Sequence, residues 1–377
     1  MATEYRINMK RYNGTDYDIM YPRTLIEQVT NGQRQIIVDS VSFGTSWTGT
    51  GPYTQVVTID GIESDSKIDI QPDADVINKL MESGTTALYI VNDSGVATAV
   101  ALGAAPNAAL TIQCTITKTA APPPPTLNPV LNENNWKAIK WASENNVGQN
   151  YWAVGDCKEV TMNGKVSDGL TLTDYTAWVY IIGFNHNAER EGNGIAFQGF
   201  KVTDKGTDVC LVDSGYNSEK TSGTWLNMNN SKTNSGGWQE SLMRKNVMPL
   251  IKAAFPSDLK AVIKPSTIFT DNTGGGTADV VPTATQDEVF LLTEYEIFGK
   301  ITYASSNEPN YLKQYAYYSA GNSKVKYKHN ATSAAAGWSE RSPRSSTSGS
   351  FCFATPTGSA NGTFASNSLG VSPAFKV

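Results

Sequence analysis

The stretch GWSERSPRSSTSGSFCFATPTGSANGTFASNSLGVSPAF, residues 337–375, decides how the rest of the chain is interpreted. Large aromatic side chains stand near both of its ends, with a long run of Ser, Thr, Gly, Ala and Asn between them. Such a run is too polar to form a core, whereas the aromatic residues supply apolar area for burial. The pattern therefore predicts surface loops that aromatic anchors hold on a β scaffold.

The composition of the whole chain favours a folded, β-rich protein. Its 377 residues suit two or three domains. The 17 Tyr, 12 Phe and 8 Trp provide enough aromatic surface to exclude general disorder. No stretch approaches about 20 consecutive apolar residues, and the N-terminus lacks the apolar core of a signal peptide. We expect a soluble protein without membrane insertion, made in the cytoplasm and released by lysis or through a dedicated assembly.

The charge distribution argues against nucleic acid as a partner. The formal net charge is -5, and no basic field suits duplex DNA. Residues 313–344 are a local exception, because they hold six Lys or Arg and a single Glu. A solvated face is the simplest interpretation, and an anionic partner such as a phosphate-bearing cell-wall polymer is the alternative.

The cysteines and histidines point to no catalytic or metal chemistry. Cys114, Cys157, Cys210 and Cys352 are far apart and form no Cys/His cluster, so we expect buried free thiols. Neither His186 nor His329 lies in a recognisable nucleophile setting. We expect no cofactor, no metal and no enzymatic activity.

A proline run divides the chain. TAAPPPPTLNP, residues 119–129, can continue neither a helix nor a central strand, and it predicts a semi-rigid linker. Residues 1–34 are too short to bury a core alone and predict an attachment or oligomerisation leader. Residues 35–118 predict a small α+β spacer domain, and residues 130–377 a larger C-terminal domain. The expected fold class is α+β and β-rich.

Local patterns predict the elements of the spacer. Residues 35–43 and 53–61 are expected to form a hairpin-like pair, because β-branched residues flank Gly and Pro turn signals. Residues 72–84 predict a helix that ends at Gly84. A second hairpin is expected over residues 86–103. Residues 108–118 predict a final strand with alternate apolar residues on one face.

The C-terminal domain shows longer but less regular patterns. Trp136 and Ile139 predict a short helix, and residues 173–187 and 193–202 predict buried strands. Residues 236–256 carry an apolar stripe that predicts a helix bent at Pro249. Residues 287–299 predict a further strand. From residue 301 onward the sequence predicts mostly surface loops with aromatic anchors.

Three segments resemble known protein groups. YNGTDYDIMYPRT (residues 12–24) resembles the leader of tail and baseplate proteins from phages and prophages of Gram-positive gut bacteria. WTGTGPYTQVVTIDGI (residues 47–62) through LTIQCTIT (residues 110–117) is similar to a small domain found behind that leader. FLLTEYEIFG, GWSERSP and GVSPAF (residues 290–299, 337–343 and 370–375) resemble a domain of C-type-lectin-like architecture. That architecture is related to formylglycine-generating enzymes and to the variable adhesins of diversity-generating retroelements.

The resemblance implies an adhesin of a virion or prophage tail tip that binds a host cell-surface receptor, glycan or protein. It also implies other tail or baseplate proteins as partners of residues 1–34, and homo-oligomerisation, with a trimer as the candidate. Small polar side chains between aromatic anchors suit adaptable hydrogen bonding, and arginines add charge-assisted contacts. The receptor-binding residues expected are Trp338, Arg341, Arg344, Ser345, Ser346, Thr347, Ser350, Phe351, Phe353, Thr357, Asn361 and Asn367, with Tyr317 from the tyrosine-rich residues 311–322.

Other interpretations of the same residues stay open. The stretch could be a solubilising loop without a partner, and the protein a structural baseplate component or a cell-wall glycan hydrolase. The carboxylate pairs Glu294/Glu296 and Glu189/Glu191 could imitate a glycosidase, but surface or structural roles are more common. EPN (residues 308–310) matches a calcium and sugar triplet of some lectins, yet a turn is the simpler expectation. DNTGGGTAD (residues 271–279) lacks the Lys of a phosphate loop and predicts a flexible loop.

Overall fold

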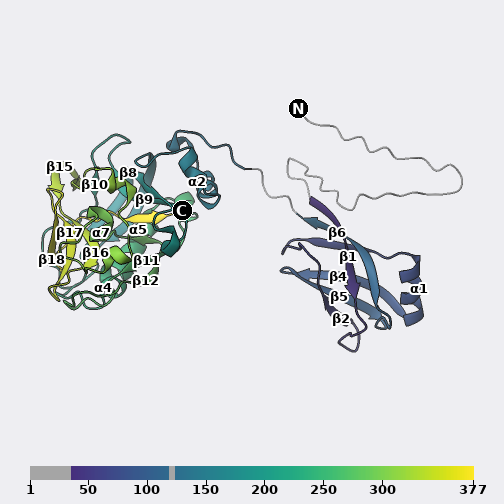
Figure 1. The fold of residues 1–377 in the computed structure, drawn as a ribbon. Coiled ribbons are helices and arrows are strands. Elements are labelled where there is room, and N and C mark those ends of the chain that lie inside the picture. Colours follow the sequence, from purple (N-terminus) through teal and green to yellow (C-terminus); the bar gives the residue numbers. More distant parts are fainter. Residues whose placement is uncertain (1–34, 119–123) are drawn as a thin grey trace. The chain divides into compact units, whose positions relative to one another are not determined.

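The computed structural model describes residues 35–118 and 124–377, which form two compact units (Figure 1). The first unit ends at Pro124 and the second begins at Pro125, inside the proline run. Strands account for 37% of residues and helices for 18%, which confirms the expected β-rich α+β class. The leader expected at residues 1–34 and most of the linker lie outside the described residues.

The first unit consists of two three-stranded antiparallel sheets and one helix that share a core. One sheet has the order β1-β6-β3 and the other β2-β5-β4. The bounds are β1 (Gln35–Phe43), β2 (Tyr53–Val57), β3 (Lys67–Gln71), α1 (Ala74–Ser83), β4 (Thr85–Asp93), β5 (Val96–Gly103) and β6 (Leu110–Lys118). Leu110, Ile112, Cys114 and Ile116 of β6 are all buried, as the alternation predicts.

The first predicted hairpin is wrong, while the predicted helix and the second hairpin are confirmed. β1 pairs with β6 over its whole length, and β2 pairs with β5, so β1 and β2 are not partners. Alternation determines which face of a strand is buried but not which strand lies beside it. Asp73 caps α1 by accepting a hydrogen bond from the Val76 N–H, and Gly84 ends it with φ of 76°.

The second unit is built on a five-stranded antiparallel sheet with the order β13-β19-β9-β8-β7. Residues far apart in the chain meet in it, because Phe375 of β19 lies opposite Phe197 of β9 and stacks on it at 5.4 Å between ring centroids. Trp136 of α2 packs edge-on against Phe197 at 5.4 Å. Phe255, after α5, packs against Phe375 at 5.5 Å. One face of the sheet is therefore covered by α2 and the end of α5.

The other face carries polar groups that are satisfied internally. Gln198 of β9 accepts hydrogen bonds from the hydroxyls of Tyr318, at 2.6 Å, and Tyr180, at 3.3 Å. Lys326 is fully buried and donates to the Tyr180 hydroxyl at 2.7 Å. Burial lowers the pKa of Lys326. The expectation that residues 313–344 form a solvated basic face is thus wrong for Lys326, which belongs to the core.

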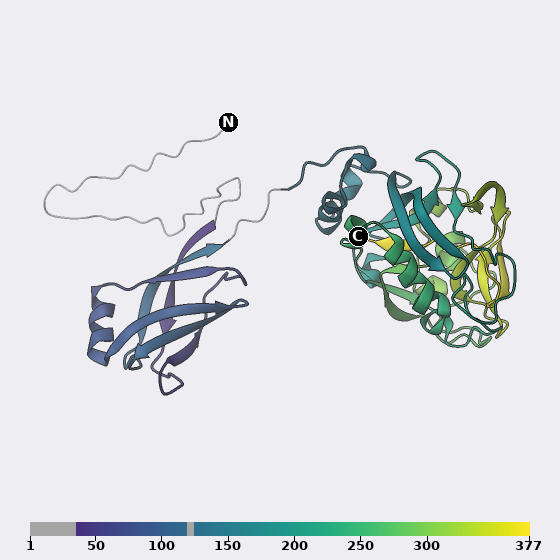
Figure 2. The same ribbon diagram turned by 180° about the vertical axis from the view of Figure 1, so that it is seen from behind.

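The remaining elements surround this sheet (Figures 1 and 2). A mixed sheet has the order β10-β14-β15, in which β10 is parallel to β14 and β14 is antiparallel to β15. Two further antiparallel sheets have the orders β11-β12 and β16-β17-β18. The helices are α2 (Trp136–Glu144), α3 (Ala188–Glu191), α4 (Gly237–Glu240), α5 (Met248–Ala254), α6 (Ser257–Lys260), α7 (Glu294–Phe298) and α8 (Ala316–Ser319), with 3-10 turns η1 (Leu131–Glu133), η2 (Gly148–Asn150) and η4 (Glu308–Asn310) and a π turn η3 (Met243–Val247). The strands are β7 (Cys157–Ser167), β8 (Leu170–Phe184), β9 (Ile195–Lys201), β10 (Val209–Cys210), β11 (Ser266–Thr270), β12 (Thr283–Asp287), β13 (Val289–Phe290), β14 (Lys326–Lys328), β15 (Ala331–Ala336), β16 (Trp338–Pro343), β17 (Ser350–Ala354), β18 (Ala360–Phe364) and β19 (Ala374–Lys376).

The long helix predicted over residues 236–256 is interrupted. α4 ends where Ser241 adopts an extended backbone with ψ of 143°, and the chain resumes as the π turn η3 and then α5. The Ser241 hydroxyl donates to the Trp238 carbonyl at 2.8 Å and so occupies an acceptor at the end of α4. Pro249 lies in the first turn of α5, where its missing N–H costs nothing. The apolar stripe is still buried, because Trp238, Met248, Ile251 and Phe255 all belong to the core.

The strand predicted over residues 287–299 is mostly wrong. It shrinks to the two residues of β13, after which α7 begins. Thr293 and Glu296 form a capping box, in which the Thr293 hydroxyl accepts from the Glu296 N–H and the Glu296 carboxylate accepts from the Thr293 N–H. A Thr followed three residues later by Glu is a local signal for the start of a helix, so the sequence itself indicates that a helix begins at this position.

The region after residue 301 belongs to the core and not mostly to loops. It contains β14 to β19, and Ala336, Trp338, Phe351, Val371 and Phe375 are buried in the main cluster. All four cysteines are buried and free, as expected, and burial raises the pKa of Cys157 to about 11. None of the helices in the described residues is both long enough and apolar enough to cross a membrane.

Candidate functional site

The quoted stretch folds mainly into the sheet β16-β17-β18, at the side of the second unit remote from α2 (Figures 1 and 2). All six residues of β16 are buried, and four of the five residues of β17 are buried. β18 pairs only with β17 in the described sheet and is partly exposed along its length. The sheet therefore has a buried strand on the inside and a polar edge strand on the outside.

A buried ion pair holds β16 in place. The Arg341 guanidinium donates to both carboxylate oxygens of Glu296, at 2.7 and 2.8 Å, and both side chains are fully buried. It also donates to the Thr270 hydroxyl at 2.6 Å and to the Phe269 carbonyl at 3.1 Å. Burial opposes the charge of Arg341, but Glu296 outweighs it and raises the pKa of the guanidinium. Arg341 thus joins β16 to α7 and β11.

Five of the expected receptor-binding residues are buried, which corrects the expectation that they contact a receptor directly. They are Trp338, Arg341, Ser350, Phe351 and Tyr317. The Trp338 indole N–H donates to the Lys324 carbonyl at 2.9 Å, and the Tyr317 ring lies 4.7 Å from that of Tyr180. The aromatic rings gain from the burial of their apolar area. Burial of the Arg341 charge is opposed by desolvation and is tolerated because its guanidinium is paired and hydrogen-bonded.

The other expected residues reach the surface to different degrees. Ser346, Thr357 and Asn361 are exposed, whereas Arg344, Ser345, Thr347, Phe353 and Asn367 are half-buried. The exposed ones do not form one cluster. The loop of residues 344–349 lies at one end of the sheet, and the turn of residues 355–359 lies at the other, with β18 between them. We call the exposed polar side chains and the exposed ring of this region the β18 surface, and they are Ser346, Ser348, Thr357, Ser359, Asn361 and Phe364.

A buried asparagine holds the loop of residues 344–349. The Asn234 side-chain amide donates to the carbonyls of Arg344, Thr347 and Ser350, and its oxygen accepts from the Gly275 N–H. Gly274 approaches so closely that an added Cβ would lie 1.8 Å from the Asn234 carbonyl oxygen, and its φ is 58°. The glycines that imitate a phosphate loop therefore serve close packing. No local pattern marks Asn234, because its partners are about 110 residues away.

Residues 213–236 form a long loop beside the β18 surface that the sequence interpretation did not connect with it. The Lys220 N–H donates to the Ser366 carbonyl at 2.7 Å, and the Asn229 N–H donates to the Ala365 carbonyl at 2.9 Å. The Lys232 ammonium lies 4.6 Å from the centroid of the Phe364 ring. This loop thus adds Lys232, whose ammonium also pairs with Glu219 at 3.1 Å, beside the exposed Phe364 ring, which is 49% accessible.

One buried carboxylate fastens that loop. Asp213 accepts hydrogen bonds from the N–H groups of Gly215 and Leu226, at 2.9 and 2.7 Å. It also accepts from the hydroxyls of Ser368, at 2.7 Å, and Ser167, at 3.2 Å. Four donors from three parts of the chain converge on one side chain, so Asp213 positions the loop against the segment after β18.

Among the carboxylates that could imitate a glycosidase or bind calcium, Glu189 is exposed, and the buried ones, Glu191, Glu294, Glu296 and Glu308, have internal partners. Glu294 is fully buried and accepts from the N–H groups of Thr302, Tyr303 and Ala304. Glu308, the first residue of EPN, is fully buried and accepts from the Ser342 hydroxyl at 2.6 Å. Neither is presented to a substrate, and the EPN triplet forms the 3-10 turn η4, as the simpler expectation had it.

One group of buried residues has the composition of a metal site. One ligand atom each from His186, Glu191 and Glu296 lies within 4.8 Å of the others. However, Glu191 already accepts from the Lys376 ammonium at 2.8 Å, and Glu296 is paired with Arg341. Burial and the charges of Lys376 and Arg341 hold the pKa of His186 well below its usual range. A divalent ion would add uncompensated charge to this neutral cluster, so we interpret it as structural.

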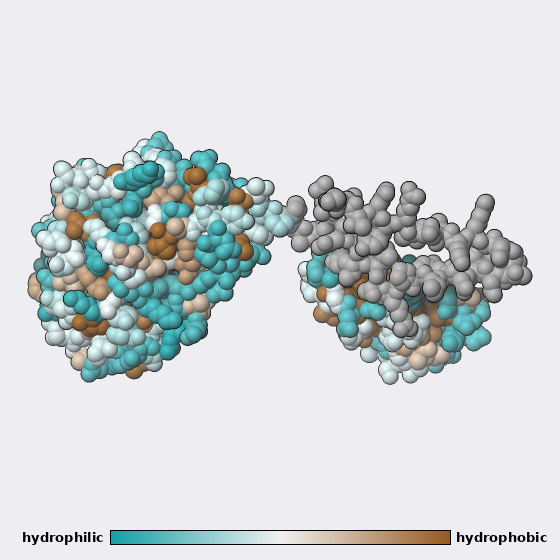
Figure 3. All heavy atoms as spheres, turned by 45° about the horizontal axis from the view of Figure 1, so that its top comes forward, coloured by the Kyte–Doolittle hydropathy of each residue, from teal (hydrophilic) through white to brown (hydrophobic). Residues whose placement is uncertain are grey.

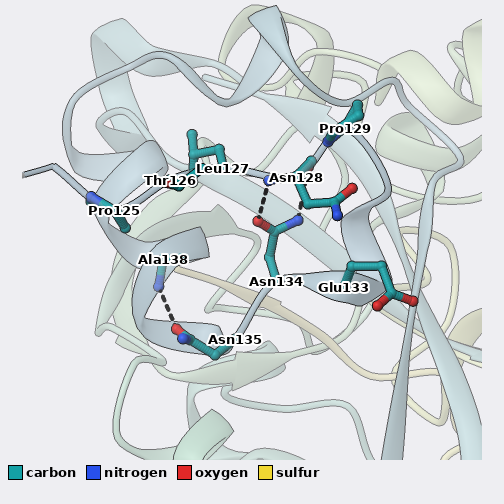
Figure 4. Close-up of a pocket in the computed structure, with 9 residues that line it drawn as sticks. All are labelled: Pro125, Thr126, Leu127, Asn128, Pro129, Glu133, Asn134, Asn135 and Ala138. Carbon is teal, nitrogen blue, oxygen red and sulfur yellow. Dashed lines mark hydrogen bonds between the residues drawn. The ribbon is translucent and has the colours of Figure 1, made fainter.

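A hollow of about 540 Å³ lies where the chain enters the second unit. Figure 4 shows the residues that line it. Asn134 accepts from the Asn128 N–H at 2.8 Å and donates to the Asn128 carbonyl at 2.9 Å. Asn135 caps α2 by accepting from the Ala138 N–H at 2.8 Å. These groups are used to turn the chain into α2, and Glu133 is the one charged side chain in the lining. The lining of this hollow therefore brings together no group of charged side chains that could bind a ligand or catalyse a reaction.

The surface of the second unit is predominantly polar on the face that Figure 3 displays, where hydrophobic residues are scattered among hydrophilic ones. Residues 209–377 match a family model described as a domain of unknown function, DUF6273. The matched segment contains Glu296, Arg341 and the whole β18 surface, but not β7, β8 or β9. No curated protein and no solved structure matches the chain.

Proposed function

We propose that this protein is an adhesin of a phage or prophage tail tip, whose second unit binds a host cell-surface receptor through the β18 surface. The resemblances of residues 12–24, 47–62 and 290–299 motivate the assignment to a tail particle. The resemblance of residues 290–299, 337–343 and 370–375 motivates a C-type-lectin-like architecture for residues 130–377. The proposed location is the virion tail, with assembly in the bacterial cytoplasm.

One observation carries the proposal. The polar edge strand β18, with its exposed aromatic ring, pairs with the mostly buried β17, which in turn pairs with the fully buried β16, on the side of the unit remote from α2. Edge strands with an exposed aromatic residue are normally protected, unless they meet a partner. At the Phe364 end of β18, Asn234 holds the loop of residues 344–349 and Asp213 holds the segment after the strand, so little conformational entropy is lost there when a ligand binds.

The chemistry of the β18 surface suits a polar receptor. Ser346, Ser348, Thr357, Ser359 and Asn361 offer hydroxyl and amide groups, and Phe364 offers a ring. Lys232 lies over that ring. Hydroxyl-rich surfaces with an aromatic residue favour weak, adaptable binding, which several copies on one particle strengthen through effective concentration. Homo-oligomerisation, with a trimer as the candidate, and attachment through residues 1–34 complete the proposal.

Binding of the purified, fluorescently labelled chain to host cells tests this function. The test variant replaces Ser346, Ser348, Thr357, Asn361 and Phe364 by Ala. The control variant replaces Thr171 and Thr173, two exposed residues of β8, by Ala. We expect the test variant to lose at least tenfold in cell binding and the control to bind like the unmodified chain, with circular dichroism unchanged for both.

The outcome also separates the alternatives. A chain that assembles into particles but whose cell binding does not depend on the β18 surface would be a structural baseplate component. Release of soluble sugar fragments from purified cell walls would indicate a glycan hydrolase. No observation favours the hydrolase, because Glu294 and Glu296 are buried and already paired.

A further inference from the structure

A second hollow, of about 380 Å³, lies between α3, the start of α7 and the residues that follow η4. Its lining includes Arg190, Tyr295, Tyr311, Lys313 and Gln314. It shares no residue with the β18 surface. Its volume lies within the range of about 300 to 1,000 Å³ that is usual for small-molecule sites.

The floor of this hollow is tied to the core. The Asn187 side-chain amide is buried and donates to the Tyr311 carbonyl and to the Glu191 carboxylate, both at 2.9 Å. Glu191 in turn accepts from the buried Lys376 ammonium at 2.8 Å. The Gln314 amide donates to the Ile297 carbonyl at 3.0 Å, which leaves its oxygen as an acceptor. The walls are therefore held in place before any ligand arrives.

Two cations, Arg190 and Lys313, and one carboxylate, Glu189, line the hollow. Within the described residues, no carboxylate lies within 4.0 Å of the Arg190 guanidinium or the Lys313 ammonium. Arg190 stacks over the Tyr311 ring at 4.5 Å and donates once, to the Asn310 carbonyl. Its other N–H groups remain available. Glu189, also in the lining, is exposed.

We propose that this hollow binds an acidic sugar, such as a carboxylated or phosphorylated monosaccharide unit of a cell-surface polymer. Arg190 and Lys313 would contact the anionic group, because guanidinium and ammonium groups bind such oxyanions with charge-assisted hydrogen bonds. Tyr295 and Tyr311 offer rings and hydroxyls to the sugar body. Glu189 and the Gln314 oxygen accept hydrogen bonds from sugar hydroxyls.

Isothermal titration calorimetry of the full chain tests this site with four probes: glucuronic acid, glucose 6-phosphate, glucose and inorganic phosphate. We expect at least one of the two acidic sugars to bind at least tenfold more tightly than either glucose or phosphate. The difference between the two acidic sugars tells which anionic group the site prefers. Raising the salt concentration is expected to weaken binding.

Two charge-removing variants locate the binding. Lys313→Gln is the decisive one, because the Lys313 ammonium makes no hydrogen bond or ion pair in the described residues, so its loss leaves the fold unchanged. Arg190→Gln removes the second cation. Each is expected to weaken acidic-sugar binding about tenfold, the effect of one charge-assisted contact. The control is Lys232→Gln beside the β18 surface, which removes a lysine charge outside the hollow and should bind the acidic sugar like the unmodified chain.

The proposal would be overturned if neither glucuronic acid nor glucose 6-phosphate bound more tightly than both glucose and inorganic phosphate. Undetectable binding of all four probes, or equal losses in the Lys313→Gln and Lys232→Gln variants, would also overturn it. These outcomes are independent of the adhesin proposal, because the five-residue β18 variant keeps the hollow intact. Loss of cell binding in that variant with unchanged sugar titrations would support both sites.

Discussion

The Arg341 guanidinium donates two hydrogen bonds to the Glu296 carboxylate, at 2.7 and 2.8 Å, and both side chains are fully buried. Forty-five residues separate the two, and the pair fastens β16 to α7. Glu296 simultaneously completes the capping box that begins α7. A single carboxylate therefore starts a helix and anchors the strand on which the β18 surface rests.

Breaking this pair should be costly. Arg341→Met leaves a buried carboxylate without its cation, and we expect a loss of about 3 to 5 kcal/mol in the free energy of unfolding. Urea denaturation measures it. The control is Lys245→Gln, which breaks an exposed ion pair with Glu240 and should cost less than about 1 kcal/mol. If the two variants were equally stable, the pair would have no special role in the core.

Asp213 should stabilise the folded conformation of the loop of residues 213–236. In Asp213→Asn an amide group replaces one acceptor oxygen, so at least one of the four donors loses its partner. We expect a loss of about 1 to 3 kcal/mol in unfolding free energy and faster proteolysis within the loop. Limited proteolysis with mass spectrometry locates the cuts. Asp204→Asn, at an exposed position, is the control, and equal digestion of both variants would speak against the role.

The contribution of Glu308 to stability should fall as pH rises from about 5 to 8. Burial raises the pKa of Glu308 from 4.5 to about 8, so the folded protein keeps a proton that the unfolded chain releases. This contribution to stability is fully present below pH 4.5 and is lost as pH rises through 8. The slope of the unfolding free energy against pH is proportional to the difference in bound protons between the unfolded and the folded chain. Glu340, whose pKa burial raises well above its usual value, acts in the same direction.

The variant Glu308→Gln tests this pH dependence. Glutamine copies the protonated carboxyl group, so the fall in unfolding free energy between pH 5 and 8 should become shallower by on the order of a few kcal/mol. Urea melts at several pH values measure it. Glu159→Gln removes an exposed carboxylate of β7 and should leave the slope unchanged. A Glu308→Gln variant with the slope of the unmodified chain would show that Glu308 does not keep its proton.

Residues 125–377 should fold when made alone. The buried cluster of this unit shares no residue with that of the first unit, and each cluster is contiguous within its own segment. We expect one cooperative urea transition and the native pattern of aromatic circular dichroism. A fragment with a non-cooperative transition would indicate that the second unit requires the residues before Pro125.

Local signals in the sequence correctly predicted several elements. The cap residues Asp73 and Gly84 delimit α1, the Ser-Gly pair at residues 94–95 makes the β4–β5 turn, and alternation identified the buried face of β6. The capping box at Thr293 was equally readable, but the apolar residues around it suggested a strand. In each case the atoms that interact lie within a few residues of one another.

The candidate site was harder to predict, because exposure is not a local property. Arg341 and Tyr317 look like surface residues in a polar stretch, yet Glu296 and Tyr180 draw them inside. Asn234 and Lys232 come from a segment about 110 to 130 residues before the loops and strand that they support. Their role follows only from the packing of residues 213–236 beside β18.

By itself the amino-acid sequence determined the β-rich class, the division at the proline run, the capped helix and the burial of the cysteines. These follow from composition and from interactions between near neighbours in the chain. Tertiary structure alone decided which strands pair, which arginine is buried and which hydroxyls reach solvent. Those outcomes depend on contacts between segments that are distant in the chain. The Arg341–Glu296 pair and the rings packed around β16 take the interior of the unit, and the polar strand β18 is left at the exposed edge of its sheet.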